Sequence, residues 1–438
     1  MRQTGLLQRG ETNSGARDGA APVPLDAALG VVMAHCRPLP AIDVELEDAL
    51  GSVLAADAVA RLDVPRFDNS AMDGFALRST TISGQCSVLQ LTGTTTAGQG
   101  PLTLGTGAEA VYVATGAPLP EHADAVVEQE LVEFRDDRTI SVLGDIAPGR
   151  NVRRHGEDVA AGQPVATAGT VLRARHLAAL AAAGVRQVTV HRRPRVAILS
   201  LGNELSPRWE ELGPGEIPDS NRYFLRAALT EAECDVVDGG SVDDDPARTV
   251  AAIAAMAKVH DAVVTTGGVG AGPLDLAAAA LSDLGPWRSF TLAVKPAKPF
   301  AFGTVGAAPV FCLPGNPVSA LVAFELLARP GLRRMAGKAP DGHLRVRATA
   351  DGSFSRQRDG KRHYLRGQAS VDVEGHWSVR PIPAKGSHQI VGASRANCLV
   401  VLDDGAGAAP GDAVTVILLS AWEPDPSFSE LTDDRRIS

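Results

Sequence analysis

The spacing of apolar residues first separates an N-terminal region from the rest of the chain. Apolar side chains recur at helical spacing over residues 25–36 and again over residues 171–183. Between them, residues 57–150 carry short β-like runs that are separated by glycine-rich turns. This order predicts one N-terminal region over residues 23–192, with a mostly β subdomain inserted into it.

Residues 193–335 show a different pattern, in which continuous apolar runs alternate with helical periodicity. The apolar runs predict strands that are buried on both faces, over residues 196–199, 236–237, 262–265, 290–294, 300–303 and 309–313. The helical patterns predict helices over residues 221–233, 245–258, 274–284 and 317–327. Strands that alternate with helices favour an α/β domain with a mainly parallel sheet.

Helical periodicity ends near residue 340. Five short alternating strands are then predicted, over residues 344–349, 363–369, 377–382, 398–402 and 413–418. Five such strands favour a small C-terminal barrel or sandwich over residues 340–420. We expect residues 1–22 to be a disordered arm and residues 421–438 to be a loose tail.

Composition and charge narrow the possible classes of protein. The chain has 438 residues, which at about 150 residues per domain favours roughly three domains. Its formal net charge of −9 argues against a general nucleic-acid or anionic-membrane binder, because such proteins usually carry a positive field. No apolar run is long enough to span a bilayer. The five cysteines are scattered, which argues against disulfides and a structural zinc site and favours a cytoplasmic protein.

Two glycine-containing turns are candidate anion sites. Residues 265–272 (TTGGVGAG) follow a predicted buried strand, and Gly267 and Gly268 would let backbone N–H groups approach an anion. The register matches neither the dinucleotide-binding nor the Walker pattern. A tight turn packed against the sheet is the alternative interpretation.

The second turn, residues 313–319 (LPGNPVS), also follows a predicted strand. Asn316 is placed to cap a helix that begins at Pro317, and Pro314 and Gly315 shape the approach to it. The free N–H groups of such a helix favour an anion, although an ordinary capped helix has the same pattern. Two loops of this kind in one sheet domain favour a phosphate ligand.

Charged residues near these loops suggest how a ligand and a cation would be held. Lys295 and Lys298 stand between prolines, which fix their backbone, so we prefer a ligand role to that of solvated surface charges. Carboxylates suit a hard cation such as Mg²⁺, and the candidates are Asp73, Asp158, Glu204, Asp244 and Asp275. For Asp245, helix capping is the stronger interpretation.

Several enzyme classes lack their sequence motifs. The chain has no G-x-S-x-G elbow and no H-E-x-x-H spacing, and its thiols are isolated. Hydrolase, metalloprotease and thiol-transfer chemistry are therefore not leading hypotheses.

Seven stretches together resemble the MoeA family of molybdopterin molybdenumtransferases, which is related to the gephyrin E domain. They are DVPRFDNSAMDGFALR (63–78), ATGAPLP (114–120), RRHGEDV (153–159), SLGNEL (200–205), TTGGVGAG (265–272), LAVKPAKPFAFG (292–303) and CLPGNPVSA (312–320). The resemblance covers nearly the whole chain. It implies an elongated multidomain subunit of α/β plus β class: a helical and β N-terminal region, a mainly parallel α/β domain of molybdopterin-binding type and a C-terminal β barrel-like domain.

The resemblance also implies a reaction, in which molybdate is inserted into adenylylated molybdopterin and AMP is released with the help of Mg²⁺. It implies a homodimer with a shared cleft, and a contact with the adenylyltransferase of the preceding step is a further expectation. The implied catalytic residues are Asp73, Glu204 and Lys295, and the implied metal ligands are Glu204, Asp244 and Asp275. The implied substrate-binding residues are Thr115, Asp158, Gly267, Gly268, Lys298, Pro314, Gly315, Asn316, Pro317, Arg366 and Ser387.

Four positions depart from the family pattern: Asn203 stands where Asp is usual, Gly270 for Ser, Leu276 for Tyr and Thr291 for Lys. The changes at Asn203 and Thr291 cancel in charge, which favours a compensated pair over two independent losses. Two other classes of function stay open: a non-catalytic pterin-binding or scaffold paralogue, and a molybdopterin adenylyltransferase.

Overall fold

The computed structural model describes residues 21–84, 86–206, 208–268, 281–340, 342–383 and 386–419. The chain divides into two compact units, the first built from residues 1–40 and 192–438 and the second from residues 41–191. Each unit is described by itself. The expected N-terminal arm up to residue 20, the C-terminal tail and most of the expected helix 274–284 lie outside the described residues.

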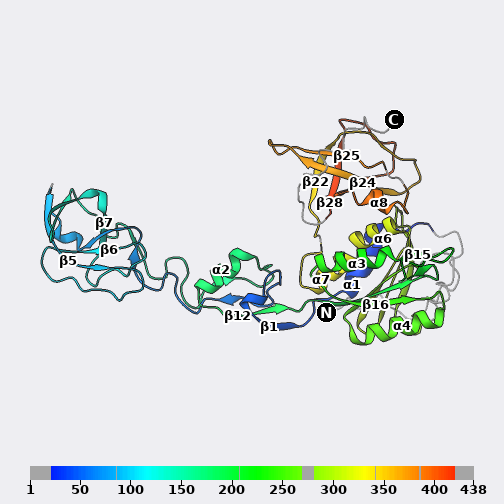
Figure 1. Ribbon diagram of the computed structural model, residues 1–438, viewed down its shortest axis with the longest axis horizontal. Helices are drawn as coiled ribbons and strands as arrows, with labels where there is room; N and C mark the ends of the chain where they lie inside the picture. The colour runs from blue at the N-terminus through cyan, green and yellow to red at the C-terminus, as the bar shows by residue number, and fades with distance from the viewer. Residues whose placement is uncertain are drawn as a thin grey trace, which may run out of the picture. The chain divides into compact units, whose positions relative to one another are not determined.

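The α/β part of the first unit is built around a six-stranded sheet in the order β16-β13-β17-β21-β20-β18 (Figure 1). The neighbours β16, β13, β17 and β21 are parallel, whereas β20 is antiparallel to both β21 and β18. The carboxyl ends of five strands therefore meet at one edge. The bounds are β13 Arg195–Leu201, β16 Asp235–Val242, β17 Ala262–Thr266, β18 Trp287–Thr291, β20 Pro299–Val305 and β21 Ala308–Leu313.

Helices cover both faces of this sheet, because alternate apolar residues of its strands point to opposite sides. One buried cluster joins a sheet face to helices α1, α3, α6 and α7, and another joins the opposite face to α4. Asp219 and Asp245 cap α3 and α4 by accepting hydrogen bonds from the N–H groups three residues on. The helices are α1 Leu25–His35, α3 Ser220–Glu231, α4 Pro246–Val259, α6 Pro317–Ala323 and α7 Arg329–Met335.

The helix that begins at Pro317 is longer than its apolar pattern predicts. A π-helical segment, η4 (Phe324–Ala328), links α6 to α7, so helical structure continues to Met335. Within it Glu325 is only 5% exposed and accepts hydrogen bonds from Arg329. Buried charged residues interrupt the apolar periodicity there, which explains why the pattern alone ends the helix near residue 327.

The expected strand over residues 290–294 is split into two in the structure. β18 ends at Thr291, and Val294–Lys295 forms β19, which pairs with a strand of the C-terminal barrel instead of the α/β sheet. The short strands β14 Leu205–Ser206 and β15 Ile217–Pro218 pair with each other beside α3.

The C-terminal part of the first unit is a closed five-stranded barrel, as the five alternating runs favour. The strands pair in the order β24-β25-β22-β28-β26, and β26 pairs back to β24. Apolar side chains from all five strands fill its centre. The bounds are β22 Arg345–Ala350, β23 Phe354–Ser355, β24 Arg362–Val371, β25 Trp377–Pro381, α8 Ile390–Ala393, β26 Cys398–Leu402, β27 Gly407–Ala408 and β28 Ala413–Leu418.

The second unit contains a six-stranded sheet in the order β7-β4-β6-β5-β9-β8, in which only β5 and β6 are parallel. Beside it, β1 pairs with β12 and β2 with β11, and α2 Ala174–Ala182 packs over them. The strands are β1 Ala41–Glu45, β2 Ala58–Val59, β3 Asn69–Ser70, β4 Gly74–Leu77, β5 Cys86–Thr95, β6 Glu109–Val113, β7 Ala125–Glu128, β8 Val132–Asp136, β9 Thr139–Leu143, β10 Val152–Arg153, β11 Pro164–Ala166 and β12 Gln187–His191. Among the described residues, no helix is long and apolar enough to cross a membrane.

Candidate functional site

Two backbone turns meet at the edge of the α/β sheet where its parallel strands end. Gly267 follows β17 with a φ of +87°, and a Cβ atom there would lie 2.0 Å from the carbonyl oxygen of Leu201. A Cβ atom on Gly315, which follows β21, would lie 3.3 Å from the Cα of Gly267. Only glycine fits at position 267, and at position 315 a side chain would be tight, so the two predicted loops are packed backbone against backbone.

Asn221 ties these two turns together from the first turn of α3. Its Nδ2 donates to the Thr266 hydroxyl and to the carbonyl of Gly315, each at 2.7 Å. The Thr266 hydroxyl in turn donates to the carbonyl of Pro314 at 3.2 Å. The role of Asn221 is not apparent from the sequence, because its local pattern shows only a polar residue after a helix cap. The pairing depends on residues 45 and 94 positions away.

Three polar side-chain atoms at this edge are buried without a hydrogen-bond partner among the residues that the structure describes. They are Ser200 Oγ, Asp219 Oδ2 and Asn221 Oδ1. Most buried polar atoms in proteins have a partner, so these three atoms have spare hydrogen-bonding capacity at one edge of the sheet. A polar ligand or bound water would satisfy them.

The start of α6 lies beside the same turns. Asn316 occupies the N-cap position and Pro317 the first helical position, but the Asn316 side chain makes no capping hydrogen bond. One free amide of the helix is already used, since Val318 N–H donates to the carbonyl of Ser387 at 3.0 Å. The structure therefore brings Ser387, from the C-terminal barrel part, to the Pro314–Pro317 loop. Arg366 lies buried in β24, and burial lowers its pKa.

The carboxylates predicted as metal ligands follow β13 and β16, which are adjacent strands. Glu204 and Asp244 are both exposed. Asn203 and Asp244 bond reciprocally: Asp244 N–H donates to Asn203 Oδ1 at 3.1 Å, and Asn203 N–H donates to Asp244 Oδ2 at 3.4 Å. Asp275, Gly270 and Leu276 lie outside the described residues.

The prediction that Asn203 and Thr291 form a compensated pair is wrong. Thr291 ends β18, and four strand spacings separate β18 from β13, after which Asn203 lies. At about 4.8 Å per spacing, this distance is about 19 Å. Asn203 bonds to Asp244 instead. The residue that departs from the family pattern at position 203 therefore has its partner on the neighbouring loop, not at Thr291.

Both predicted lysines carry exposed side chains on the segment that leaves the α/β sheet. Lys295 lies opposite His363 in the pairing of β19 with β24. Burial is the main cause that lowers the pKa of His363, and the charge of Lys295 acts in the same direction. The carbonyl of Lys298 accepts from Leu292 N–H at 2.7 Å, which holds the Lys298 backbone.

In the second unit, Asp73 and Thr115 form a contact that their separation in sequence does not show. Asp73 Oδ1 accepts from Thr115 N–H at 2.7 Å and from the Thr115 hydroxyl at 2.9 Å. These bonds, the backbone one first, lower the pKa of Asp73. The side chain is nonetheless exposed, so it is an ionised, oriented carboxylate that faces solvent.

The stretches FDNSAMDG and RRHGED pack against each other in the same unit. Asp68 accepts from Arg154 Nη1 and from His155 N–H, each at 2.7 Å. Although partial burial raises the pKa of Asp68, these two neighbours bring it below its ordinary value. Asp158 is exposed, and its N–H donates to the carbonyl of Val64 at 2.9 Å.

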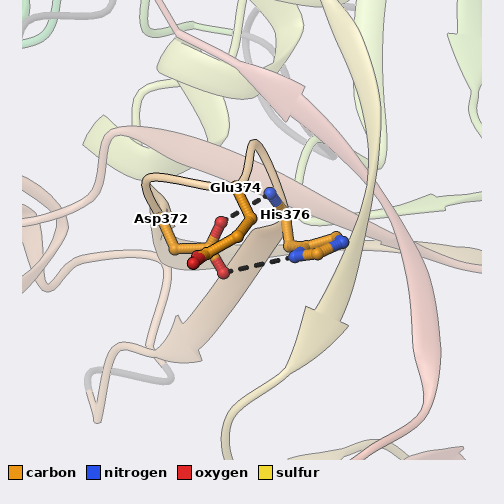
Figure 2. A group of neighbouring side chains, drawn as sticks. All are labelled: Asp372, Glu374 and His376. Atoms are coloured by element: carbon orange, nitrogen blue, oxygen red, sulfur yellow. Dashed lines mark hydrogen bonds and ion pairs between the residues drawn. The ribbon is translucent and has the colours of Figure 1, made fainter.

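One further group of possible metal ligands lies away from the predicted one. Among the described residues, the ligand atoms of Asp372, Glu374 and His376 are within 4.8 Å of one another. Figure 2 shows that all three come from the single turn between β24 and β25. Asp372 already accepts from His376 N–H at 2.8 Å and pairs with its ring at 3.4 Å. These bonds organise an exposed hairpin turn and account for the cluster without a metal.

Comparison with family models places known regions along most of the chain. Residues 23–184 match the MoeA N-terminal region (domain I and II), and residues 197–334 match a probable molybdopterin binding domain. Residues 347–419 match the MoeA C-terminal region (domain IV).

Curated proteins and solved structures agree with these matches. A molybdopterin molybdenumtransferase from Haemophilus influenzae is 35% identical over 85% of this chain and 92% of its own length. One from Staphylococcus aureus is 31% identical over 94% of this chain and 98% of its own length. The crystal structure of a MoeA molybdopterin biosynthesis protein from Pyrococcus horikoshii superimposes with a TM-score of 0.78 and 33% identity, covering 92% of this chain and all of that one.

Proposed function

We propose that this chain, which belongs to the MoeA family of molybdopterin molybdenumtransferases, inserts molybdate into adenylylated molybdopterin and releases AMP. The observation that carries the proposal is the carboxyl edge of the α/β sheet. There Asn221 holds two glycine-containing turns together beside buried polar atoms that lack partners. Ligands of open α/β sheets bind at this edge.

The residues at this edge suit the reaction in chemical terms. In the proposed reaction, the two dithiolene sulfurs bind molybdenum, and an oxygen of molybdate leaves as water with the two thiol protons, so that molybdenum keeps its oxidation state. A second water molecule cleaves the bond that joins AMP to the pterin phosphate and supplies the oxygen that completes the separated phosphates. The exposed side chains of Lys295 and Lys298 would hold the anionic substrates. The backbone of the Pro314–Pro317 loop would face a phosphate, since N–H groups at a helix start favour anions.

Mg²⁺ would fit the carboxylates that follow β13 and β16. Glu204 and Asp244 are exposed, and the oxygen Oδ2 of Asp244 has only a long contact of 3.4 Å to Asn203 N–H. Oxygen donors of this kind suit a hard cation, and Asp275 is proposed as a further ligand. Bound Mg²⁺ would neutralise charge on the phosphate oxygens. Asn203 holds the Asp244 backbone in place for this role.

We further propose that the protein works in the cytoplasm as a homodimer whose subunits share the cleft, with Asp73, Thr115 and Asp158 contributing to substrate binding or turnover. Contact with the adenylyltransferase of the preceding step is part of this proposal. Light scattering combined with an activity assay tests the dimer: activity should follow the dimer fraction upon dilution. A fully active monomer at micromolar concentration would refute the shared cleft.

The central experiment is incubation of the full chain with adenylylated molybdopterin, Mg²⁺ and molybdate, with AMP measured by chromatography. AMP release that depends on molybdate supports the transferase. Binding of the pterin without AMP release would favour a scaffold paralogue, an alternative suggested by Asn203 and Thr291. Consumption of ATP with molybdopterin would instead indicate an adenylyltransferase.

A further inference from the structure

A small cavity with an aromatic wall lies beside the candidate site, along α3. It has a volume of about 220 Å³ and is lined by Leu205, Ser206 and Trp209, by residues of α3 and its N-cap, and by residues of the edge strand β16. The Trp209 and Tyr223 rings pack at a centroid distance of 5.1 Å, and their side chains are 48% and 60% exposed. The volume is below the about 300–1,000 Å³ of cavities that enclose a whole drug-sized ligand, so it suits one ring system of a larger ligand.

One lining residue of this cavity is a buried carboxylate with an unsatisfied oxygen. Asp219 lines the cavity and is only 7% exposed. Its Oδ1 caps α3 by accepting from Arg222 N–H at 3.1 Å, whereas Oδ2 is buried with no partner among the described residues. A buried carboxylate oxygen is costly without a donor, so a ligand N–H group is the natural complement.

Cations complete the lining. Arg222 pairs with Asp238, with Nε donating to Oδ2 at 2.6 Å, and this pair forms the side of the cavity. Arg226, one turn further along α3, adds a second guanidinium at the cavity. A ligand that fits is therefore flat, carries an N–H donor and is attached to an anionic group.

We propose that this cavity binds a fused-ring nitrogen heterocycle with an exocyclic amino group, stacked on Trp209 and donating to the carboxylate of Asp219. The proposal rests on the proposed function, since adenylylated molybdopterin carries two such rings, adenine and the pterin. The cavity lies near the turns that would hold the phosphates, because Asp219 and Asn221 both belong to the start of α3. It would therefore fix one ring while those turns hold the phosphates.

Calorimetric titration of the full chain with AMP and, separately, with 6-hydroxymethylpterin distinguishes the two rings. Whichever ring occupies the cavity should bind the wild type, and its affinity should fall about ten- to a hundredfold in Trp209→Ala. Trp209→Phe should restore most of that loss. If AMP is the ligand, purine riboside 5′-monophosphate, which lacks the amino group, should bind the wild type weakly.

Asp219→Asn tests the carboxylate without removing the helix cap, since Asn is also a good N-cap. It should weaken the ligand at least about tenfold. Asp245→Asn is the matched control: it changes the charge of the α4 cap, which accepts from Arg248 N–H at 2.8 Å, and should leave binding unchanged. Unchanged affinity for both ligands in Trp209→Ala and Asp219→Asn would overturn the proposal, and so would a wild type that binds neither. If binding depends on these residues but no AMP is released from adenylylated molybdopterin, the proposed function fails and the ring site stands.

Discussion

Individual side chains in the two units are held in position by few and identifiable bonds. Asp73 keeps its charge because two hydrogen bonds from Thr115 favour the ionised form. Asn203 keeps its orientation through the backbone of Asp244. Both contacts involve exposed residues, so they orient side chains and contribute little buried surface. Substitution of these residues should therefore change the rate of the reaction more than the stability of the fold.

Asp73→Asn should reduce the rate of AMP release about ten- to a hundredfold, because that factor corresponds to the free energy of one hydrogen bond to a charged group. The amide oxygen still accepts from Thr115, so we expect thermal stability to stay unchanged by calorimetry. Asp136→Asn is the control, because Asp136 is also exposed and accepts from a backbone N–H, that of Arg138, at 2.8 Å. Near-wild-type turnover of Asp73→Asn would remove this carboxylate from the mechanism.

Asn203→Asp and Thr291→Lys should act independently, because about four strand spacings separate them and distant sites add. Asn203→Asp places a second carboxylate beside Asp244, so half-maximal AMP release should need about tenfold less Mg²⁺. In a double-mutant cycle on AMP release, the coupling energy should stay below about 0.5 kcal/mol. A coupling well above about 1 kcal/mol would instead require that the two positions interact.

Three irregular elements create unusual local environments: the turns after β17 and β21, and the π-helical segment η4. The turns bring backbone segments unusually close together, and η4 carries a charged side chain into the core. Gly267 lets a backbone turn pass a carbonyl oxygen that any side chain would strike. In η4, Glu325 brings a carboxylate into the core, where Arg329 and His343 pair with it. Each arrangement depends on one residue, Gly267 or Glu325, whose role is not visible in the local sequence pattern.

Gly267→Ala should destabilise the protein by about 3 kcal/mol or more in urea unfolding, because the new Cβ meets the carbonyl oxygen of Leu201. Gly306→Ala is the control that measures the cost of backbone strain without the clash. Gly306 also has a positive φ, of +60°, but a Cβ atom there would have nothing within 4 Å. The control should therefore cost only about 1–2 kcal/mol. Equal losses in the two variants would show that the turn relaxes around the side chain.

Glu325→Gln should cost about 3–5 kcal/mol in urea unfolding at neutral pH, because it removes the buried carboxylate that pairs with the buried guanidinium of Arg329. Burial raises the pKa of Glu325, but His343 and Arg329 outweigh burial and lower it below its ordinary value. The stabilisation is therefore complete above about pH 4.3 and is lost as the pH falls through the lowered pKa. The difference between wild type and variant should shrink in acid.

Glu231→Gln is the matched control for this pair. Glu231 approaches the same guanidinium at 3.7 Å, but its side chain is 54% exposed. An exposed pair of this kind is worth about 0–1 kcal/mol. A loss as large as that of Glu325→Gln would contradict the role given to burial.

At the scale of the whole molecule, the chain is two units, and the second is one continuous segment inserted into the first. Residues 41–191 have buried clusters of their own, drawn from the six-stranded sheet and from the β1–β12 pair with α2. A segment with its own core could fold alone. The first unit, by contrast, is assembled from the two ends of the chain.

Residues 41–191, expressed alone, should therefore unfold cooperatively in urea and give a dispersed amide NMR spectrum. A fragment that begins at residue 57 lacks β1 and leaves β12 unpaired, so it should be markedly less stable. A collapsed amide spectrum for residues 41–191 would show that this unit depends on the rest of the chain.

The sequence alone determined most elements, because periodicity reports which face of each is buried. The predicted strands 398–402 and 413–418 have the same bounds in the structure, and the α/β and barrel classes follow from the same patterns. The sequence did not predict contacts between residues that are far apart along the chain. Asn221 bonds Gly315, 94 residues on, and Val318 bonds Ser387.

Tertiary structure decided these contacts, because sheet order, and not local spacing, sets which chain segments become neighbours. The adjacency of β13 and β16 pairs Asn203 with Asp244, whereas four strand spacings keep it from Thr291. Charge counting along the sequence cannot distinguish these two outcomes. The buried oxygen of Asp219 is likewise apparent only in the tertiary structure, in which Asp219 lines a cavity together with Trp209 and residues of β16.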